Sequence, residues 1–173
     1  MKKRMVLMMI VVMIAVPAAL FAGDGISLGM TAIYDTPLTI GEVMDMEEAP
    51  EIPEIDPEDL LYGAEVRLDL SLFQVGAEIL YSEDLGAAVL YTNAGVYLDL
   101  GIIGFGAGAG PVVITDFSDA MITGYNVKAT ADLRLGSLIL STYAAGLVED
   151  LTNIADEYED MDMAIGASVL IQL

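Results

Sequence analysis

VRLDLSLF at residues 66–73 sets a pattern that recurs as VYLDLGII at 96–103 and ADLRLGSL at 131–138. Each copy alternates apolar and polar residues, passes through two residues and then resumes the alternation. Residues that flank a two-residue hairpin turn face each other across the ladder, so their side chains share one face of the sheet. The flanking pairs are apolar in every copy: Leu70 with Phe73, Leu100 with Ile103, and Leu135 with Leu138. The repeat therefore predicts a meandering antiparallel sheet with one continuous apolar face.

The same alternation extends over eight segments of the chain. Successive side chains of a strand point to opposite faces, so each segment has an apolar face and a polar or glycine-bearing face. The predicted strands are 26–34, 60–70, 73–81, 88–100, 103–113, 125–135, 138–148 and 163–173. Two-residue turns follow the second, fourth and sixth strands, so all the longer connections emerge at one end of the sheet. The acidic connections at 37–59 and 149–162 are predicted to be solvated loops, because such sequence cannot bury itself.

The first 22 residues have the pattern of a secretory signal peptide. Three basic residues at 2–4 precede an uninterrupted apolar run from Met5 to Ala22, and Pro17 with the small residues after it favours cleavage. The alternative is an uncleaved membrane anchor, for which this run is at the short limit. We therefore predict an exported protein with a signal peptide at 1–22 and one β-barrel domain at 23–173.

Composition limits the functions open to the chain. It holds 27 acidic and six basic residues. Three of the basic residues would be removed with the signal peptide, so the remaining chain has three basic and 27 acidic residues and a net charge of −24. Nucleic-acid binding is excluded, because no basic patch exists to neutralise phosphates. Histidine and cysteine are absent, which excludes histidine-dependent catalysis, ordinary zinc sites and a disulfide framework.

We accordingly expect no enzyme, no catalytic residues, no cofactor and no dedicated metal centre. The acidic loops are the one candidate for weak Ca²⁺ binding, because clustered carboxylates are hard oxygen ligands. The segment 42–59 lacks the spacing of an EF-hand loop, so a solvated run of charge is the simpler interpretation.

Two kinds of barrel share this alternation. In a soluble barrel of the lipocalin type the apolar face lines the inside and binds an apolar ligand, whereas in a membrane barrel it meets lipid. A soluble exterior should carry charge at about a quarter to a third of its positions. Here the polar face is sparsely charged, and its fifth strand offers only the glycines at 104, 106, 108 and 110. No predicted apolar-face position is charged, as lipid contact requires, and the pattern favours a transmembrane barrel.

Four tyrosines support the same orientation. They lie on the apolar face, at the strand ends next to the long connections: Tyr34, Tyr62, Tyr81 and Tyr125. An interfacial aromatic girdle occupies this position, where the ring meets headgroups and the hydroxyl meets water. Ordinary strand-end tyrosines are the alternative, because aromatic residues favour strands in any case.

The polar face collects a cluster of charges that would lie inside a membrane barrel. Its predicted members are Glu65, Arg67, Asp69, Glu78, Lys128, Asp132 and Arg134. The turn at 71–72 places Glu65 directly opposite Glu78, and two facing carboxylates repel unless a cation or proton intervenes. Arg67 is the nearest candidate, with Lys128 or Arg134 reaching across the lumen. The main interpretation is an ionic plug that fills a narrow barrel, and a proton or ion relay is the alternative.

In these features the chain resembles the small eight-stranded outer-membrane β-barrels of diderm bacteria. It shares their export signal, eight amphipathic strands, short turns at one rim and long connections at the other. Its last strand reaches the final residue, although Leu173 stands where the family usually has an aromatic residue.

The resemblance implies an all-β, eight-stranded antiparallel up-and-down transmembrane β-barrel in the cell outer membrane. Its partner would be outer-membrane lipid, and its acidic loops would face outward. The role expected from the resemblance is structural or one of surface interaction, with an extracellular or envelope protein as a further partner of the loops.

Overall fold

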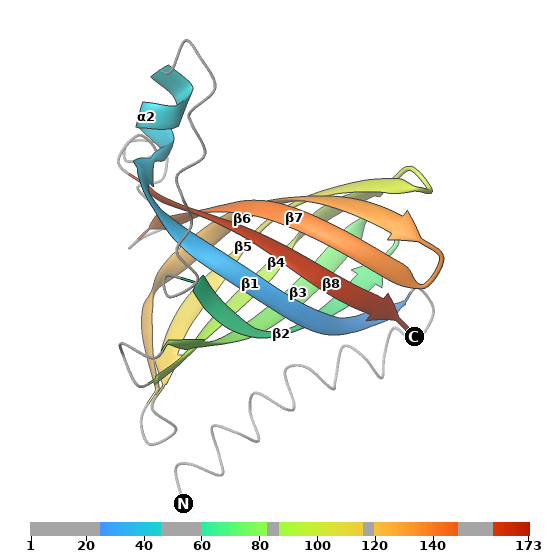
Figure 1. The fold of residues 1–173 in the computed structure, drawn as a ribbon, viewed down its shortest axis with the longest axis horizontal. Helices are drawn as coiled ribbons and strands as arrows, with labels where there is room; N and C mark the ends of the chain where they lie inside the picture. The colour runs from blue at the N-terminus through green and yellow to red at the C-terminus, as the bar shows by residue number, and fades with distance from the viewer. Residues whose placement is uncertain (1–24, 46–59, 83–86, 116–119, 149–160) are drawn as a thin grey trace, which may run out of the picture.

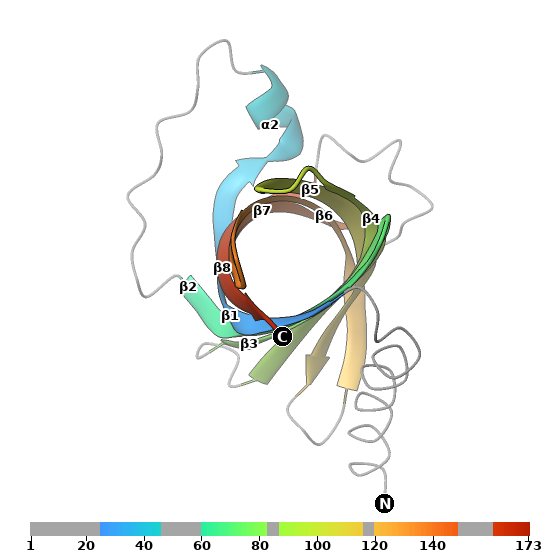
Figure 2. The ribbon, with the colours of Figure 1, turned by 90° about the vertical axis from the view of Figure 1, so that its right-hand side faces the viewer.

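The computed structural model describes residues 25–45, 60–82, 87–115, 120–148 and 161–173, which form a closed antiparallel barrel (Figure 1). Each strand pairs with the next along the chain, and β1 closes the ring by pairing with β8, as the end-on view in Figure 2 shows. The elements in chain order are β1 (Ile26–Thr39), α2 (Ile40–Asp45), β2 (Leu60–Leu70), β3 (Phe73–Ser82), β4 (Ala87–Asp99), β5 (Ile103–Thr115), β6 (Ala120–Leu135), β7 (Leu138–Val148) and β8 (Asp162–Gln172). The predicted all-β class, the eight strands and their up-and-down order are confirmed.

Within the described part of the chain, no helix is long and apolar enough to cross a membrane. The predicted signal peptide at 1–22 lies outside the described residues, as do residues 46–59 and 149–160 of the two acidic connections.

The three repeated phrases form the predicted two-residue hairpin turns. The register pairs Leu70 with Phe73 and Leu135 with Leu138, and the backbone N–H of Leu100 donates to the carbonyl of Ile103 at 2.9 Å. In each turn only the first central residue has a positive φ, which is the pattern of the type II′ turn: Ser71 at 59°, Gly101 at 90° and Gly136 at 69°. The turns lie at the same end of the barrel as the C-terminus (Figure 1).

At the other rim several strands extend beyond their predicted ends. β1 continues to Thr39 instead of ending at Tyr34, and α2 follows it, so the predicted loop 37–59 begins as strand and helix. The extended part of β1 pairs with β8: Thr39 pairs with Asp162, and the Thr36 hydroxyl donates to the carbonyl of Met163 at 2.7 Å. β8 likewise takes Asp162 from the second predicted loop.

β6 also begins before its predicted start, at Ala120 instead of 125. The added residues extend the pairing with β5 past an irregularity at Val112 and Val113. A bulge shifts the alternation by one residue, which is why the simple period of two in the sequence stopped short of it.

Alternation along the strands sorts the side chains into two sets. Large apolar side chains are exposed on all eight strands, among them Met30, Ile79, Leu98, Phe105 and Ile171. The charged and hydroxyl side chains of the opposite face are mostly buried inside. Arg67 points into the barrel, so its neighbour Leu68 lies on the outer face, although Leu68 is itself buried.

Tyrosine rings inside the barrel lie over glycines of the neighbouring strand. Tyr97 pairs directly with Gly106, and Tyr143 pairs directly with Gly166. A Cβ atom added at Gly104 or Gly166 would overlap the ring or hydroxyl of the facing tyrosine. The glycine face of β5 therefore makes room for a ring from β4, in line with the narrow interior that the sequence predicted.

The interior has two layers. Near the long connections it is an apolar cluster of buried side chains, namely Ile33, Leu80, Val89, Tyr91, Val112, Tyr143 and Ala164. From the middle of the barrel to the two-residue turns it is polar and charged. The barrel is thus filled with apolar side chains at one end and with charged ones toward the other.

A buried side-chain amide makes hydrogen bonds at a gap in the pairing of β4 with β5. Pro111 has no N–H to donate, and the paired register of the two strands is interrupted beside it, between Tyr91 and Ala94. Asn126 of β6 donates from Nδ2 to the carbonyl oxygens of Thr92 and Gly110, both at 2.9 Å. This side chain supplies donors that the strand ladder lacks, which explains why an amide is almost completely buried there.

Gly166→Ala should lower the free energy of unfolding by about 1–3 kcal/mol, the usual cost of forcing a methyl group into a packed site. The measurement is urea unfolding of the barrel refolded in detergent. In a Tyr143→Leu background the facing ring is gone, so most of that cost should disappear. An equal cost in both backgrounds would show that the ring contact is not its cause.

Candidate functional site

All seven residues of the predicted interior cluster point into the barrel. They come from β2 (Glu65, Arg67 and Asp69), β3 (Glu78) and β6 (Lys128, Asp132 and Arg134), and all except Arg134 are buried. In a closed ring of eight strands, β2 and β6 stand on opposite sides. Contacts between them therefore cross the lumen and fill it.

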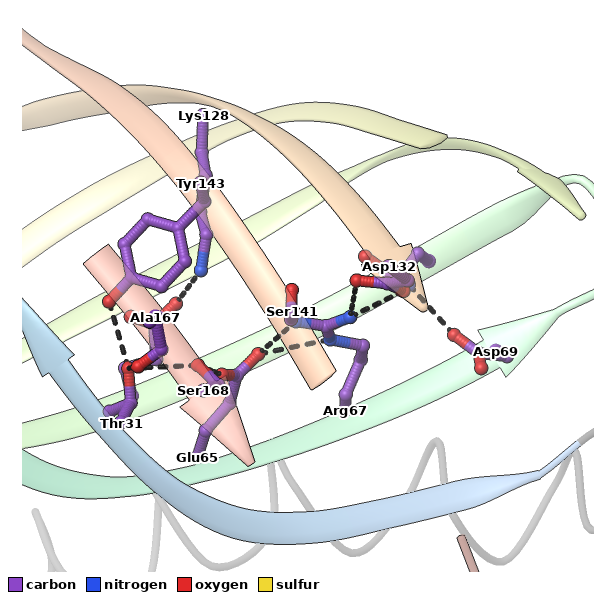
Figure 3. Close-up of polar contacts among 12 residues, drawn as sticks. Thr31, Glu65, Arg67, Asp69, Lys128, Asp132, Ser141, Tyr143, Ala167 and Ser168 are labelled. Atoms are coloured by element: carbon purple, nitrogen blue, oxygen red, sulfur yellow. Dashed lines mark hydrogen bonds and ion pairs between the residues drawn. The ribbon is translucent and has the colours of Figure 1, made fainter. Parts of the chain in front are cut away.

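Arg67 is the centre of the cluster (Figure 3). Its guanidinium binds Asp132 through Nη1, at 3.0 and 2.8 Å to the two carboxylate oxygens, and binds Glu65 through Nε and Nη2 at 3.0 and 2.7 Å. Nη2 also donates to the Ser141 hydroxyl at 3.1 Å. Arg67 is 1% exposed, so both carboxylates neutralise a charge that water does not reach. The planar fork of arginine suits this arrangement, because it serves two carboxylates at once.

Arg134 forms the second cluster, closer to the two-residue turns. Its Nη2 binds Asp69 at 2.7 Å, and its Nη1 lies 3.3 Å from Asp99, whose side chain is about half exposed. Gln74 donates to the other oxygen of Asp69 at 2.8 Å. Tyr97 connects this cluster to the first, because its hydroxyl accepts from Arg134 Nε at 3.1 Å and donates to Asp132 at 2.9 Å.

Lys128 forms the third cluster, with Glu78 across the lumen. Its Nζ donates to Glu78 Oε1 and lies 3.6 Å from the centroid of the Tyr143 ring, within the range of a cation–π contact. Glu65 does face Glu78, as the sequence predicted. Of the cations that the sequence offered for these two carboxylates, Arg67 pairs with Glu65, and Lys128 reaches across the lumen to neutralise Glu78. Arg67 also pairs with Asp132.

Three hydroxyls join Lys128's cluster to Arg67's (Figure 3). The Tyr143 hydroxyl lies 2.8 Å from Thr31 Oγ1, which accepts from Ser168 at 3.0 Å. Ser168 Oγ also makes a close contact to Glu65 Oε2. Contacts therefore run without a break from Glu78 in the middle of the barrel to Asp99 at the turns.

The network is suited to holding the wall together. Each of the three cations is bound to at least one carboxylate, and the carboxylates carry further donors from tyrosine, serine or glutamine. Buried charges with complete partners act as a structural unit. Among the described residues, no three carboxylates come together in a way that would hold a metal ion. The acidic stretches proposed for Ca²⁺ lie mainly outside the described residues.

The four tyrosines of the predicted girdle differ in exposure. Tyr62 and Tyr81 pair directly across β2 and β3, and each is at least half exposed on the outer face. Tyr125 is half-buried. Tyr34 departs from the prediction because it is buried, in an outer groove that Leu60 and Ile165 also line.

Sequence reasoning missed several members of the network: Thr31, Gln74, Tyr97, Ser141, Tyr143 and Ser168. A signal for Tyr97 was available, since it stands two residues before Asp99 and therefore on the same face. Tyr143 and Ser141 were harder to find, because the alternation in β7 is weak. Both faces of β7 carry apolar residues, such as the buried Ile139 and the exposed Leu140.

No protein-family profile, curated protein or solved structure matches this chain.

Arg67→Met should lower the free energy of unfolding by about 3–5 kcal/mol, because it leaves Glu65 and Asp132 buried without their cation. Urea unfolding of the refolded barrel measures the loss. Arg134→Met is the matched control, and it should cost less because Arg134 and its partner Asp99 are partly exposed.

Adding Glu65→Gln and Asp132→Asn to Arg67→Met should recover most of the lost stability, because the unpaired charges are then gone. A triple variant no more stable than Arg67→Met would contradict the charge argument and point to lost packing instead.

Proposed function

We propose that this chain is a non-enzymatic integral outer-membrane β-barrel, with a structural or surface-interaction role carried by its long acidic connections. One observation carries the proposal. Large apolar side chains are exposed on the outer face of all eight strands, while the ionic cluster is buried inside. This is the reverse of the distribution that a barrel dissolved in water needs.

The size of the apolar surface supports lipid as its partner. Exposed large apolar residues reach from the two-residue turns, at Leu72, Ile102 and Leu135, to Ile122 near the other rim. Soluble monomers rarely expose a continuous apolar patch of more than a few hundred Å². Burial in hydrocarbon would remove this surface from water at a gain of about 25 cal/mol per Å².

The alternative is a soluble exported barrel of the lipocalin type that binds an apolar ligand inside. The apolar cluster around Ile33, Leu80 and Val89 is the observation in its favour. These side chains pack against one another and are almost completely buried, and the ion pairs of Arg67 and Lys128 occupy the middle of the lumen. We therefore favour the membrane proposal.

Two features define the role we propose. The cross-lumen ion pairs fill the interior, which fits a scaffold better than an open pore. The net charge of −24 after signal removal makes cationic surfaces the favoured partners of the exposed connections. The connections face outward in this proposal, and the two-residue turns face the periplasm.

Met30→Arg should reduce spontaneous insertion into phosphatidylcholine vesicles, with a loss of about 2–4 kcal/mol in folding free energy. Met30 lies midway along the part of β1 that pairs with β2, and it is 72% exposed. Insertion is measured by the heat-modifiable migration of the folded barrel on gels.

Leu135→Arg at the turn rim is the control. This residue is also exposed, but near the interface the cost falls to about 0–1 kcal/mol. Equal insertion of Met30→Arg and the unchanged chain would count against the membrane proposal, as would recovery of the exported protein in the soluble periplasmic fraction.

A further inference from the structure

The hydroxyl of Thr130 is buried on the inner face of β6 without a protein partner. Thr130 is 9% exposed and stands between Lys128 and Asp132 on the charged face of the strand. Among the described residues, its Oγ1 atom and the Ser27 Oγ atom are the buried side-chain polar atoms that lack a hydrogen bond. Buried hydroxyls nearly always find a partner in protein or ordered water, so both atoms need an explanation.

A small interior cavity lies beside Thr130, and Ser27 is not among the residues that line it. Its volume is about 10 Å³, which is close to the least space that holds one water molecule. Glycines of β4 and β5, Gly95, Gly106 and Gly108, form one wall. Because glycine has no side chain, none projects into the cavity from these three positions.

Val96 and Ala107 complete that side of the cavity, and the other lining residues are polar. Gln74, Asn93 and Lys128 join Thr130 around the cavity. A buried water needs two to four polar partners, and amide, ammonium and hydroxyl groups supply both donors and acceptors. The volume is too small for a larger ligand, and the ammonium group of Lys128 opposes a bound cation.

We propose that this cavity is a binding site for a single water molecule, held by the Thr130 hydroxyl and by polar groups of Gln74, Asn93 and Lys128. The water connects two parts of the ionic network that the hydrogen bonds described above join around the opposite side of the lumen, through Tyr143, Thr31 and Ser168. Lys128 belongs to the cluster of Glu78, whereas Gln74 belongs to the cluster of Asp69 and Arg134. With the water in place, the network forms a closed ring inside the barrel.

Crystal structures of the refolded full-length barrel in detergent, for the unchanged chain and for Thr130→Val and Thr130→Ser, test the site. We expect an ordered water within hydrogen-bond distance of residue 130 in the unchanged chain and in Thr130→Ser. Thr130→Val has nearly the same shape but no hydroxyl, and it should lose this water. Density for no water in the unchanged chain, or the same water in Thr130→Val, would overturn the proposal.

Unfolding in urea gives a second readout that does not require crystals. Thr130→Val should unfold at a lower urea concentration than the unchanged chain, because the remaining polar groups lose the partner that the water supplied. Ser27→Ala is the matched control, since it removes a hydroxyl that is equally unpartnered but does not line this cavity, and its midpoint should not fall. Equal midpoints for Thr130→Val and the unchanged chain would contradict a water held by Thr130.

Discussion

The cross-lumen pairing of Arg67 with Asp132 is the interaction on which the rest of the structure depends. A buried charge is tolerated only with partners. One partner, Glu65, is on the same strand, and the other, Asp132, stands on the opposite side of the ring, on β6. A slip of one residue in the register of β2 would move Arg67 to the outer apolar face and bring Val66 or Leu68 inside. The ion pair therefore fixes which face points outward, and with it the exposed apolar surface that the functional proposal uses.

The two ends of the interior serve different needs. Toward the two-residue turns the lumen is filled by ion pairs that reach partly exposed groups at Asp99 and Arg134. Toward the long connections it is filled by apolar side chains such as Leu80 and Ile33. Glycines leave room for the rings of Tyr97 and Tyr143 against the barrel wall. The hydroxyls of these tyrosines take part in the hydrogen bonds of the charged layer. A barrel filled in this way is a rigid support, and specific function is more naturally assigned to what the support presents at its rim.

Much of this fold could be predicted because its main determinant is local. A period of two identifies a strand and its faces from neighbouring residues alone, which is why β2, β3 and β7 have their predicted starts and why all seven interior charges point inward. Lys128 and Arg134 could be named as cations that reach across the lumen, but which carboxylate each one meets could not be predicted, because a contact across the lumen depends on the shear of the closed ring. The extension of β1 depends on pairing with β8, and the extension of β6 passes a bulge, so neither follows from alternation.

Oxygen accessibility of spin labels along β8 tests the central claim, that the outer face meets lipid, most directly. The chain has no cysteine, so single cysteines at Met163, Ile165, Ala167, Val169 and Ile171 can each carry one nitroxide. In protein reconstituted into vesicles, the account predicts that collisions with oxygen are strongest at Ala167 and weaker toward both ends, while a water-soluble nickel chelate shows the opposite profile. High and uniform access of the nickel chelate at all five positions would contradict the account.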